Sequence, residues 1–245
     1  MAIPHFQGKI IGATRNVVWL AAQRHRARMH DELNGCMTAS IDGEPPIHEE
    51  IALPENAPRW IVSLVRMNSV TKASETIWNG ITMEERANGQ LAREITVGLP
   101  IELSREQNIA LMQDFVRTHI VTMGVVADWV FHDINDNPHV RLLHTLRPVT
   151  EDGFGRKTIA VLDESGKAVR HSDRNKIVYR SVIGGRDEFI ALRKSWGDVV
   201  NRHLEASGSG ERIDMRSYKE QGIDKVPTTH VGPTKLAIAR RRHGL

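Results

Sequence analysis

The sequence contains few of the residues on which several classes of protein depend. It has one cysteine, Cys36, which excludes an internal disulfide and fits a reducing compartment. No apolar run approaches the roughly 20 residues needed to span a bilayer, and the first dozen residues lack the pattern of a signal peptide. There is no internal repeat, and there are only two tyrosines, Tyr179 and Tyr218. We therefore expect a cytoplasmic protein without a membrane partner.

The remaining composition is that of a globular protein with local clusters of positive charge. The 245 residues are 40% hydrophobic and 26% charged, with a formal net charge of +3. Three arginines, Arg24, Arg26 and Arg28, lie within seven residues, and the last residues of the chain are basic again. Such clusters either follow the phosphate backbone of a nucleic acid or lie on a solvated face.

The order of periodic segments predicts a mixed α+β fold. Strands are expected over residues 6–11, 48–53, 94–99, 125–133 and 139–146, a hairpin over 156–181, and helices over 16–33, 59–86 (broken near 68), 104–123 and 186–206. We interpret residues 1–206 as one domain with an antiparallel sheet and flanking helices. Residues 207–245 are expected to form a basic, partly irregular carboxy-terminal tail.

The strand expected over 139–146 carries the residues with the most specific chemistry. Side chains alternate along a strand, so His139 and Arg141 share one face, while His144 lies on the other face with apolar residues. If the preceding strand pairs antiparallel, His132 meets His139 across the turn. Two imidazoles placed in this way either form part of a metal site or only make hydrogen bonds.

The chain around these histidines resembles the MobA/MobL family of conjugative relaxases, which belong to the HUH type. The resemblance is carried by Asn137-Pro138-His139 before an alternating strand, and it extends in order over nearly the whole chain. Further matching segments are 54–58 (PENAP), 90–94 (QLARE), 103–107 (LSREQ), 150–155 (TEDGFG), 216–224 (RSYKEQGID) and 227–232 (PTTHVG). The resemblance is strongest to the relaxase portion of rhizobial TraA-type transfer proteins. It implies an HUH relaxase-like palm built on an antiparallel sheet.

The resemblance also implies a chemistry, from which this chain departs at two positions. In the family, a tyrosine on the first helix attacks a DNA phosphate, and a divalent metal (Mg or Mn) held by three histidines polarises that phosphate. The tyrosine position is Gln23 here, and the third histidine position is Arg141; the other two histidines match as His132 and His139. Glu94 either orients a metal-binding histidine or is a solvated strand carboxylate.

Three functions remain open from the sequence. The first is an enzyme that nicks DNA at a plasmid transfer origin, the reaction expected for the family but disfavoured here by Gln23 and Arg141. The second is a binding module that holds single-stranded or hairpin transfer-origin DNA, with Arg141 gripping a phosphate in place of the metal. The third is a non-catalytic scaffold or remnant that contacts other conjugation proteins.

Overall fold

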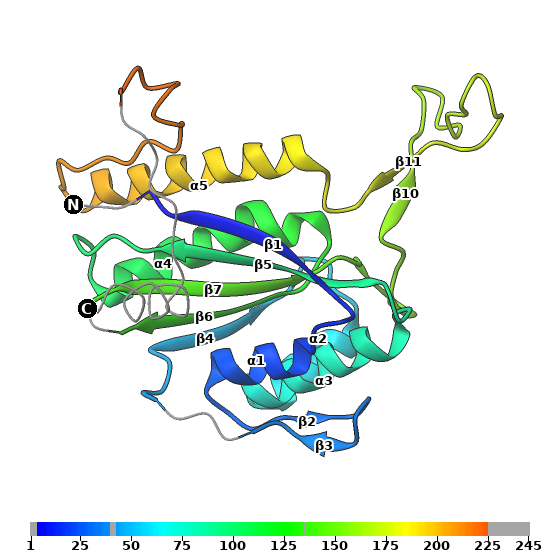
Figure 1. Cartoon of the computed structure of the whole chain (residues 1–245), viewed down its shortest axis with the longest axis horizontal. Helices are drawn as coiled ribbons and strands as arrows, with labels where there is room; N and C mark the ends of the chain where they lie inside the picture. Colours follow the sequence, from blue (N-terminus) through cyan, green and yellow to red (C-terminus); the bar gives the residue numbers. More distant parts are fainter. Residues whose placement is uncertain (1–3, 40–42, 135, 225–245) are drawn as a thin grey trace, which may run out of the picture. The chain divides into compact units, whose positions relative to one another are not determined.

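The computed structural model describes residues 4–39, 43–134 and 136–224, and its centre is a five-stranded sheet (Figure 1). The strands run in the order β1-β5-β7-β6-β4, and every neighbouring pair is antiparallel. Their bounds are β1 (Phe6–Gly12), β4 (His48–Ala52), β5 (Gln90–Gly98), β6 (Ala127–Asp133) and β7 (Pro138–Thr145). The α+β class with an antiparallel sheet is confirmed.

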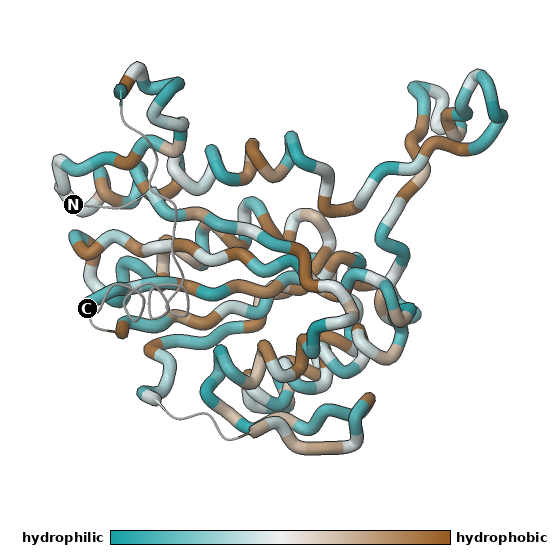
Figure 2. The backbone as a smooth tube through the Cα atoms, in the orientation of Figure 1, coloured by the Kyte–Doolittle hydropathy of each residue, from teal (hydrophilic) through white to brown (hydrophobic). Residues whose placement is uncertain are grey.

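Helices cover both faces of this sheet. On one face, α1 (Val17–His25), α2 (Arg59–Met67) and α3 (Val70–Glu84) share a buried cluster with strand residues such as Ala92 and Leu143. On the other face lie α4 (Arg105–Phe115) and α5 (Arg186–Ala206), where the rings of Phe115 and Trp196 meet edge to face at 5.1 Å. Figure 2 shows hydrophobic and hydrophilic residues alternating along α5, as expected for a helix with one buried face.

The ends of α4 and α5 agree with the sequence signals. Ser104 caps α4 in the predicted box with Gln107, and the helical run continues through a π-turn (Val116–Ile120) and a 3-10 turn (Val121–Met123). Gly124 then ends this run with a φ of 79°, which glycine adopts without strain. Helix α5 spans the predicted residues 186–206.

The first helix is shorter than predicted. It was expected to reach residue 33, but it ends at His25, because Arg26 adopts the left-handed conformation (φ 52°) and its amide bonds the carbonyl of Ala22. The following residues form a small antiparallel pair, β2 (His30–Asp31) and β3 (Cys36–Met37). This early stop fixes where Arg24 and Arg26 lie in the fold.

The predicted hairpin over 156–181 is present as an arm that projects from the sheet (Figure 1). Its base is the antiparallel pair β10 (Thr158–Ala160) and β11 (Tyr179–Ser181), and a turn at Asp163–Lys167 lies within it. The small pair β8 (Val149–Thr150) and β9 (Gly153–Phe154) precedes the arm.

The described residues up to Asp214 form one compact unit, and the described residues 215–224 belong to a second one. Within the first unit, the segment after α5 folds back on that helix: the Asn201 side chain exchanges two hydrogen bonds of 2.8 Å with the backbone of Ile213. In the second unit, the Glu220 carboxylate accepts hydrogen bonds from the amide and hydroxyl of Ser217. The tail predicted after residue 206 stays a prediction, because residues 225–245 lie outside the described part of the chain.

No helix in the described ranges is long and apolar enough to cross a membrane.

Candidate functional site

The predicted pair of histidines is brought together at the end of two central strands. His132 on β6 lies directly opposite His139 on β7, with ring centroids 5.7 Å apart and ring planes 32° from parallel. His132 is buried, with 4% of its surface exposed, and His139 is half-buried. His144 lies on the opposite face and is fully buried, with its Nδ1 bonded to the carbonyl of Thr145. The predicted pairing and the exclusion of His144 therefore agree with the structure.

The end of α1 meets this pair. The backbone of Arg24, which directly follows Gln23, lies close enough to the His132 ring to raise its pKa against the effect of burial. The His139 ring bonds the carbonyl of Asn137 through Nδ1, at 2.8 Å. The His139 ring therefore uses one nitrogen on a backbone carbonyl, which leaves its second nitrogen for the site. The backbone of α1 therefore places residue 23 near the two histidines.

The charges that surround the two rings are positive. The pKa of His132 is lowered to about 4, mostly by burial and also by His139, Arg26 and Arg141. Burial also lowers the pKa of His139, as does the charge of Arg141. Arg141 is exposed and shares its sheet face with His139. Both imidazoles are therefore neutral at neutral pH, beside two guanidinium groups.

The structure corrects the expectations for Arg24 and Glu94. Arg24 is only 3% exposed and forms an ion pair with the buried Glu94 carboxylate, so it is neither a solvated arginine nor a surface contact for DNA phosphate. The second Glu94 oxygen lies 2.5 Å from the Lys9 ammonium group. The recorded partners of Glu94 are therefore two cations. The sequence left two alternatives for Glu94, an acceptor that orients a histidine or a solvated carboxylate. Its position agrees with neither. Of the three clustered arginines, Arg28 is exposed and Arg26 is half-buried.

The side chains present do not fit the divalent metal that the family resemblance implies. Two imidazole nitrogens face the site, but the position of the third ligand holds the guanidinium of Arg141, which repels a cation. The carboxylate of Asp133, which acts on His139, is paired with Arg105 at 3.6 Å. Within the described ranges, no three histidine, cysteine or acidic side chains are grouped in a way that could hold a metal ion. We therefore derive no chemistry through a metal at this site.

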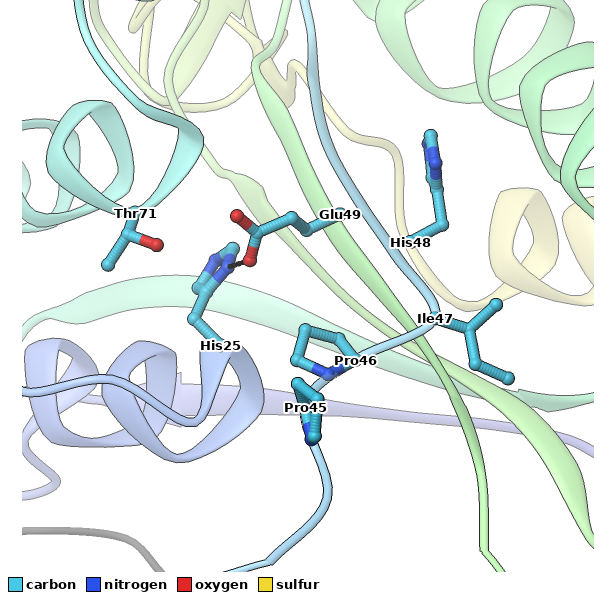
Figure 3. A pocket seen from close by; sticks show the side chains of 7 residues that line it. All are labelled: His25, Pro45, Pro46, Ile47, His48, Glu49 and Thr71. Carbon is cyan, nitrogen blue, oxygen red and sulfur yellow. Dashed lines mark hydrogen bonds and ion pairs between the residues drawn. The ribbon is translucent and has the colours of Figure 1, made fainter.

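A second polar network, which sequence reasoning missed, lies behind the end of α1. His25 bonds the fully buried Asp128 through Nε2 at 2.9 Å and Glu49 through Nδ1 at 2.8 Å (Figure 3). Asp128 also accepts hydrogen bonds from Ser74 Oγ (2.6 Å) and Trp78 Nε1 (2.7 Å). Burial alone would lower the pKa of His25, but the two carboxylates outweigh it and raise the pKa to about 9. The network joins α1 and α3 to β4 and β6.

His25 and Glu49 line an open cavity of about 470 Å³, which is completed by Pro45, Pro46 and Thr71 among others. Figure 3 shows His25 and Glu49 pointing toward each other at this cavity, while His48 points away. The signal for this network in the sequence was Asp128, an aspartate within the apolar first part of its strand, from Val125 to Phe131. A buried carboxylate needs partners, and the sequence alone did not identify them.

Comparison with known proteins places this arrangement in a family. The chain matches the MobA/MobL family over residues 15–241. It is 45% identical to the conjugal transfer protein TraA of Rhizobium radiobacter, over 98% of this chain and 22% of that protein. It is 29% identical to the mobilization protein MobL of Acidithiobacillus ferridurans, over 98% of this chain and 65% of that protein. The chain thus spans about a fifth of the length of its rhizobial relative.

The fold is also found in a solved structure. A structure from work on the molecular basis of vancomycin resistance transfer in Staphylococcus aureus superposes with a TM-score of 0.62. It is 27% identical, and the match covers 87% of this chain and 98% of that one. Together with the match over residues 15–241, these relationships establish that the chain belongs to the MobA/MobL family.

Proposed function

We propose that this chain is a relaxase-like domain of plasmid conjugation or mobilisation that holds single-stranded or hairpin transfer-origin DNA without cutting it. The observation that carries the proposal is the meeting of two imidazoles and two guanidinium groups where α1 ends beside β6 and β7. The names of its relatives, which are conjugal transfer and mobilization proteins, support the same assignment.

The chemistry of the cluster favours a phosphate oxyanion over a cation. Arg141 presents an exposed planar guanidinium group, which binds phosphate oxygens through paired N–H donors, and Arg26 adds a second positive charge. In the neutral His139 ring, the nitrogen that faces the site is an acceptor, because the other nitrogen carries the proton donated to the carbonyl of Asn137. A bound phosphate therefore favours uptake of a proton by His139 or His132, which turns that acceptor into a donor. Affinity for DNA is expected to increase as the pH falls.

The same positions argue against nicking. Gln23 presents a carboxamide, which cannot form the phosphotyrosyl bond expected for the family. Tyr179 lies in β11 of the projecting arm, and Tyr218 lies in the second compact unit. Neither tyrosine is on α1, whose end contacts His132. We therefore place the chain's function in binding, with the scaffold role as the alternative.

The arm offers a second contact surface for DNA. Residues 156–182 contain seven lysines and arginines against three acidic residues, and the arm projects from the sheet (Figure 1). Exposed Tyr179 and Leu162 lie among these charges. A basic ribbon that carries exposed apolar side chains is a common way to follow a nucleic-acid backbone.

The proposal is tested by binding of a labelled single-stranded oligonucleotide, with and without a hairpin, in EDTA over a range of salt concentrations. Arg141→Gln and Arg26→Gln should each weaken binding and flatten the slope of log affinity against log salt by about 0.7 per lost phosphate contact. Arg117→Gln is the matched control, because Arg117 is an exposed arginine on the helical run after α4. Binding by the parent chain that does not depend on salt would favour the scaffold role instead.

A further inference from the structure

A second cavity lies on the other face of the sheet, away from the paired histidines. It measures about 250 Å³ and lies between the edge strand β1, strand β5 and the start of α5. Its lining includes Gly8, Ile10, Arg93, Gly185, Arg186 and Phe189. Lys9 is the remaining lining residue, but its ammonium group is paired with Glu94 on the opposite face of the sheet, so the cations of the cavity are Arg93 and Arg186.

Arg93 is the unusual residue of this cavity. It is only 9% exposed, yet its guanidinium group has no hydrogen bond or ion pair to any residue that the structure describes. The guanidinium group lies over the ring of Phe189, whose centroid is 5.0 Å from the guanidinium carbon. Burial lowers the pKa of Arg93, but a guanidinium group stays charged at neutral pH. A largely buried charge without a counter-charge is costly, so an anion bound beside Arg93 would stabilise it.

The packing holds Arg93 at the cavity. A methyl group at Gly8 would come within 2.2 Å of the Phe189 ring, so this ring lies directly against the backbone of β1. Phe189 in turn lies under the Arg93 guanidinium group, which restricts where that group can point. The guanidinium group is thus held in place before any ligand arrives.

The start of α5 places a second guanidinium group at the cavity. The helix begins after its N-cap, Gly185, and the side chain of Arg186 is exposed there. The Gly185 amide donates a hydrogen bond of 2.8 Å to the Glu188 carboxylate, so an acidic group of the chain already occupies the first turn. The positive charge available to a bound anion therefore comes from the two arginines.

We propose that this cavity is a phosphate-binding site, in which Arg93 and Arg186 hold a phosphate oxyanion at the start of α5. A planar guanidinium group binds two oxygens of a tetrahedral phosphate at once, so two such groups can hold one phosphate between them. The phosphate belongs either to a DNA backbone or to a free small molecule. Only the DNA source rests on the function proposed above.

The test measures the thermal midpoint of unfolding with added inorganic phosphate, with chloride keeping the ionic strength constant. It uses the Arg141→Gln background, so that the histidine site does not contribute. We expect phosphate to raise the midpoint, and we expect Arg93→Met or Arg186→Glu to weaken the apparent phosphate affinity about tenfold or more. Arg117→Gln should behave as the background does. No rise in the background protein, or an equal rise in both cavity variants, would overturn the proposal.

Two further measurements keep the test decisive. If circular dichroism shows that Arg93→Met does not fold, the Arg186→Glu variant decides the outcome alone, because the Arg186 side chain is exposed. The salt slope of oligonucleotide binding then separates the two sources of phosphate. A slope reduced by about 0.7 in the cavity variants assigns the site to a DNA phosphate, and an unchanged slope with lost phosphate stabilisation assigns it to a free phosphate compound. Because the measurement with inorganic phosphate does not require DNA binding, it tests the cavity even if the function proposed above is wrong.

Discussion

The backbone of Arg24, at the end of α1, lies close enough to the His132 ring to raise its pKa, so the end of this helix lies at the paired histidines. The residue before Arg24 is Gln23, at the position where the family resemblance expects a tyrosine. The backbone thus places residue 23, where the resemblance implies a nucleophile, near the histidines, where it implies a metal. The side chains of Gln23 and Arg141 supply neither the nucleophile nor the third metal ligand. Most of the predictions below follow from this contrast.

The first prediction concerns restoration of nicking. The parent chain should form no covalent adduct with an origin oligonucleotide, because Gln23 offers no nucleophile. Gln23→Tyr alone should give at most a trace, and Gln23→Tyr with Arg141→His should give far more than either change, because groups that act in one transition state are strongly non-additive. The readout is a denaturant-resistant protein–DNA band with Mg²⁺ or Mn²⁺ present. A strong band from the parent chain would contradict the non-cutting assignment.

The second prediction concerns metal affinity. Calorimetry with Mn²⁺ should show no tight site in the parent chain, because two neutral imidazoles and a guanidinium group do not supply enough ligands. Arg141→His should create a site, and adding His139→Gln to that variant should remove it again. Tight stoichiometric binding by the parent chain would show that the guanidinium group of Arg141 turns away from the rings.

The third prediction concerns the pH dependence of stability. The pKa of His25 is raised from 6.5 to about 9 in the folded chain, so the folded state binds a proton more tightly than the unfolded state. The stabilisation is complete below pH 6.5 and is lost as the pH rises through 9, with a size on the order of 3 kcal/mol. Urea unfolding across this range should show the decline. His25→Gln should be less stable at pH 6 and should lack this pH dependence; an unchanged profile would mean that His25 is neutral in the fold.

The fourth prediction concerns the buried ion pair of Arg24 and Glu94. Glu94→Gln leaves the Arg24 charge buried without its partner, which should cost about 3–5 kcal/mol of the free energy of unfolding. The double variant Arg24→Met, Glu94→Leu removes both charges and should recover much of that loss. Lys9→Met is the control, because the Lys9 side chain is 49% exposed and should contribute little. A Glu94→Gln variant as stable as the parent would show that water reaches Arg24.

The sequence predicted the sheet and the histidine pair because both depend on local alternation. Side chains of a strand alternate, so the pairing of β6 with β7 follows once the turn between them is recognised, and the same holds for the inward face of α5. The burial of Arg24 could not be predicted in this way. Its partner Glu94 is 70 residues away, and α1 ends at a left-handed arginine in place of a glycine. The contacts of His25 and Arg93 likewise join residues that are far apart in the sequence, so no local sequence pattern predicts them.

The central claim is that a phosphate is held by arginine and histidine side chains at the position where the family resemblance expects a metal. Its most direct test is binding of the single-stranded oligonucleotide in EDTA between pH 8 and pH 6, for the parent chain, Arg141→Gln and His139→Gln. We expect the parent chain to bind without metal and to bind more tightly as the pH falls. Arg141→Gln should weaken binding at every pH, and His139→Gln should flatten the pH dependence. Binding that requires a divalent metal, or that is unchanged by Arg141→Gln, would contradict the claim.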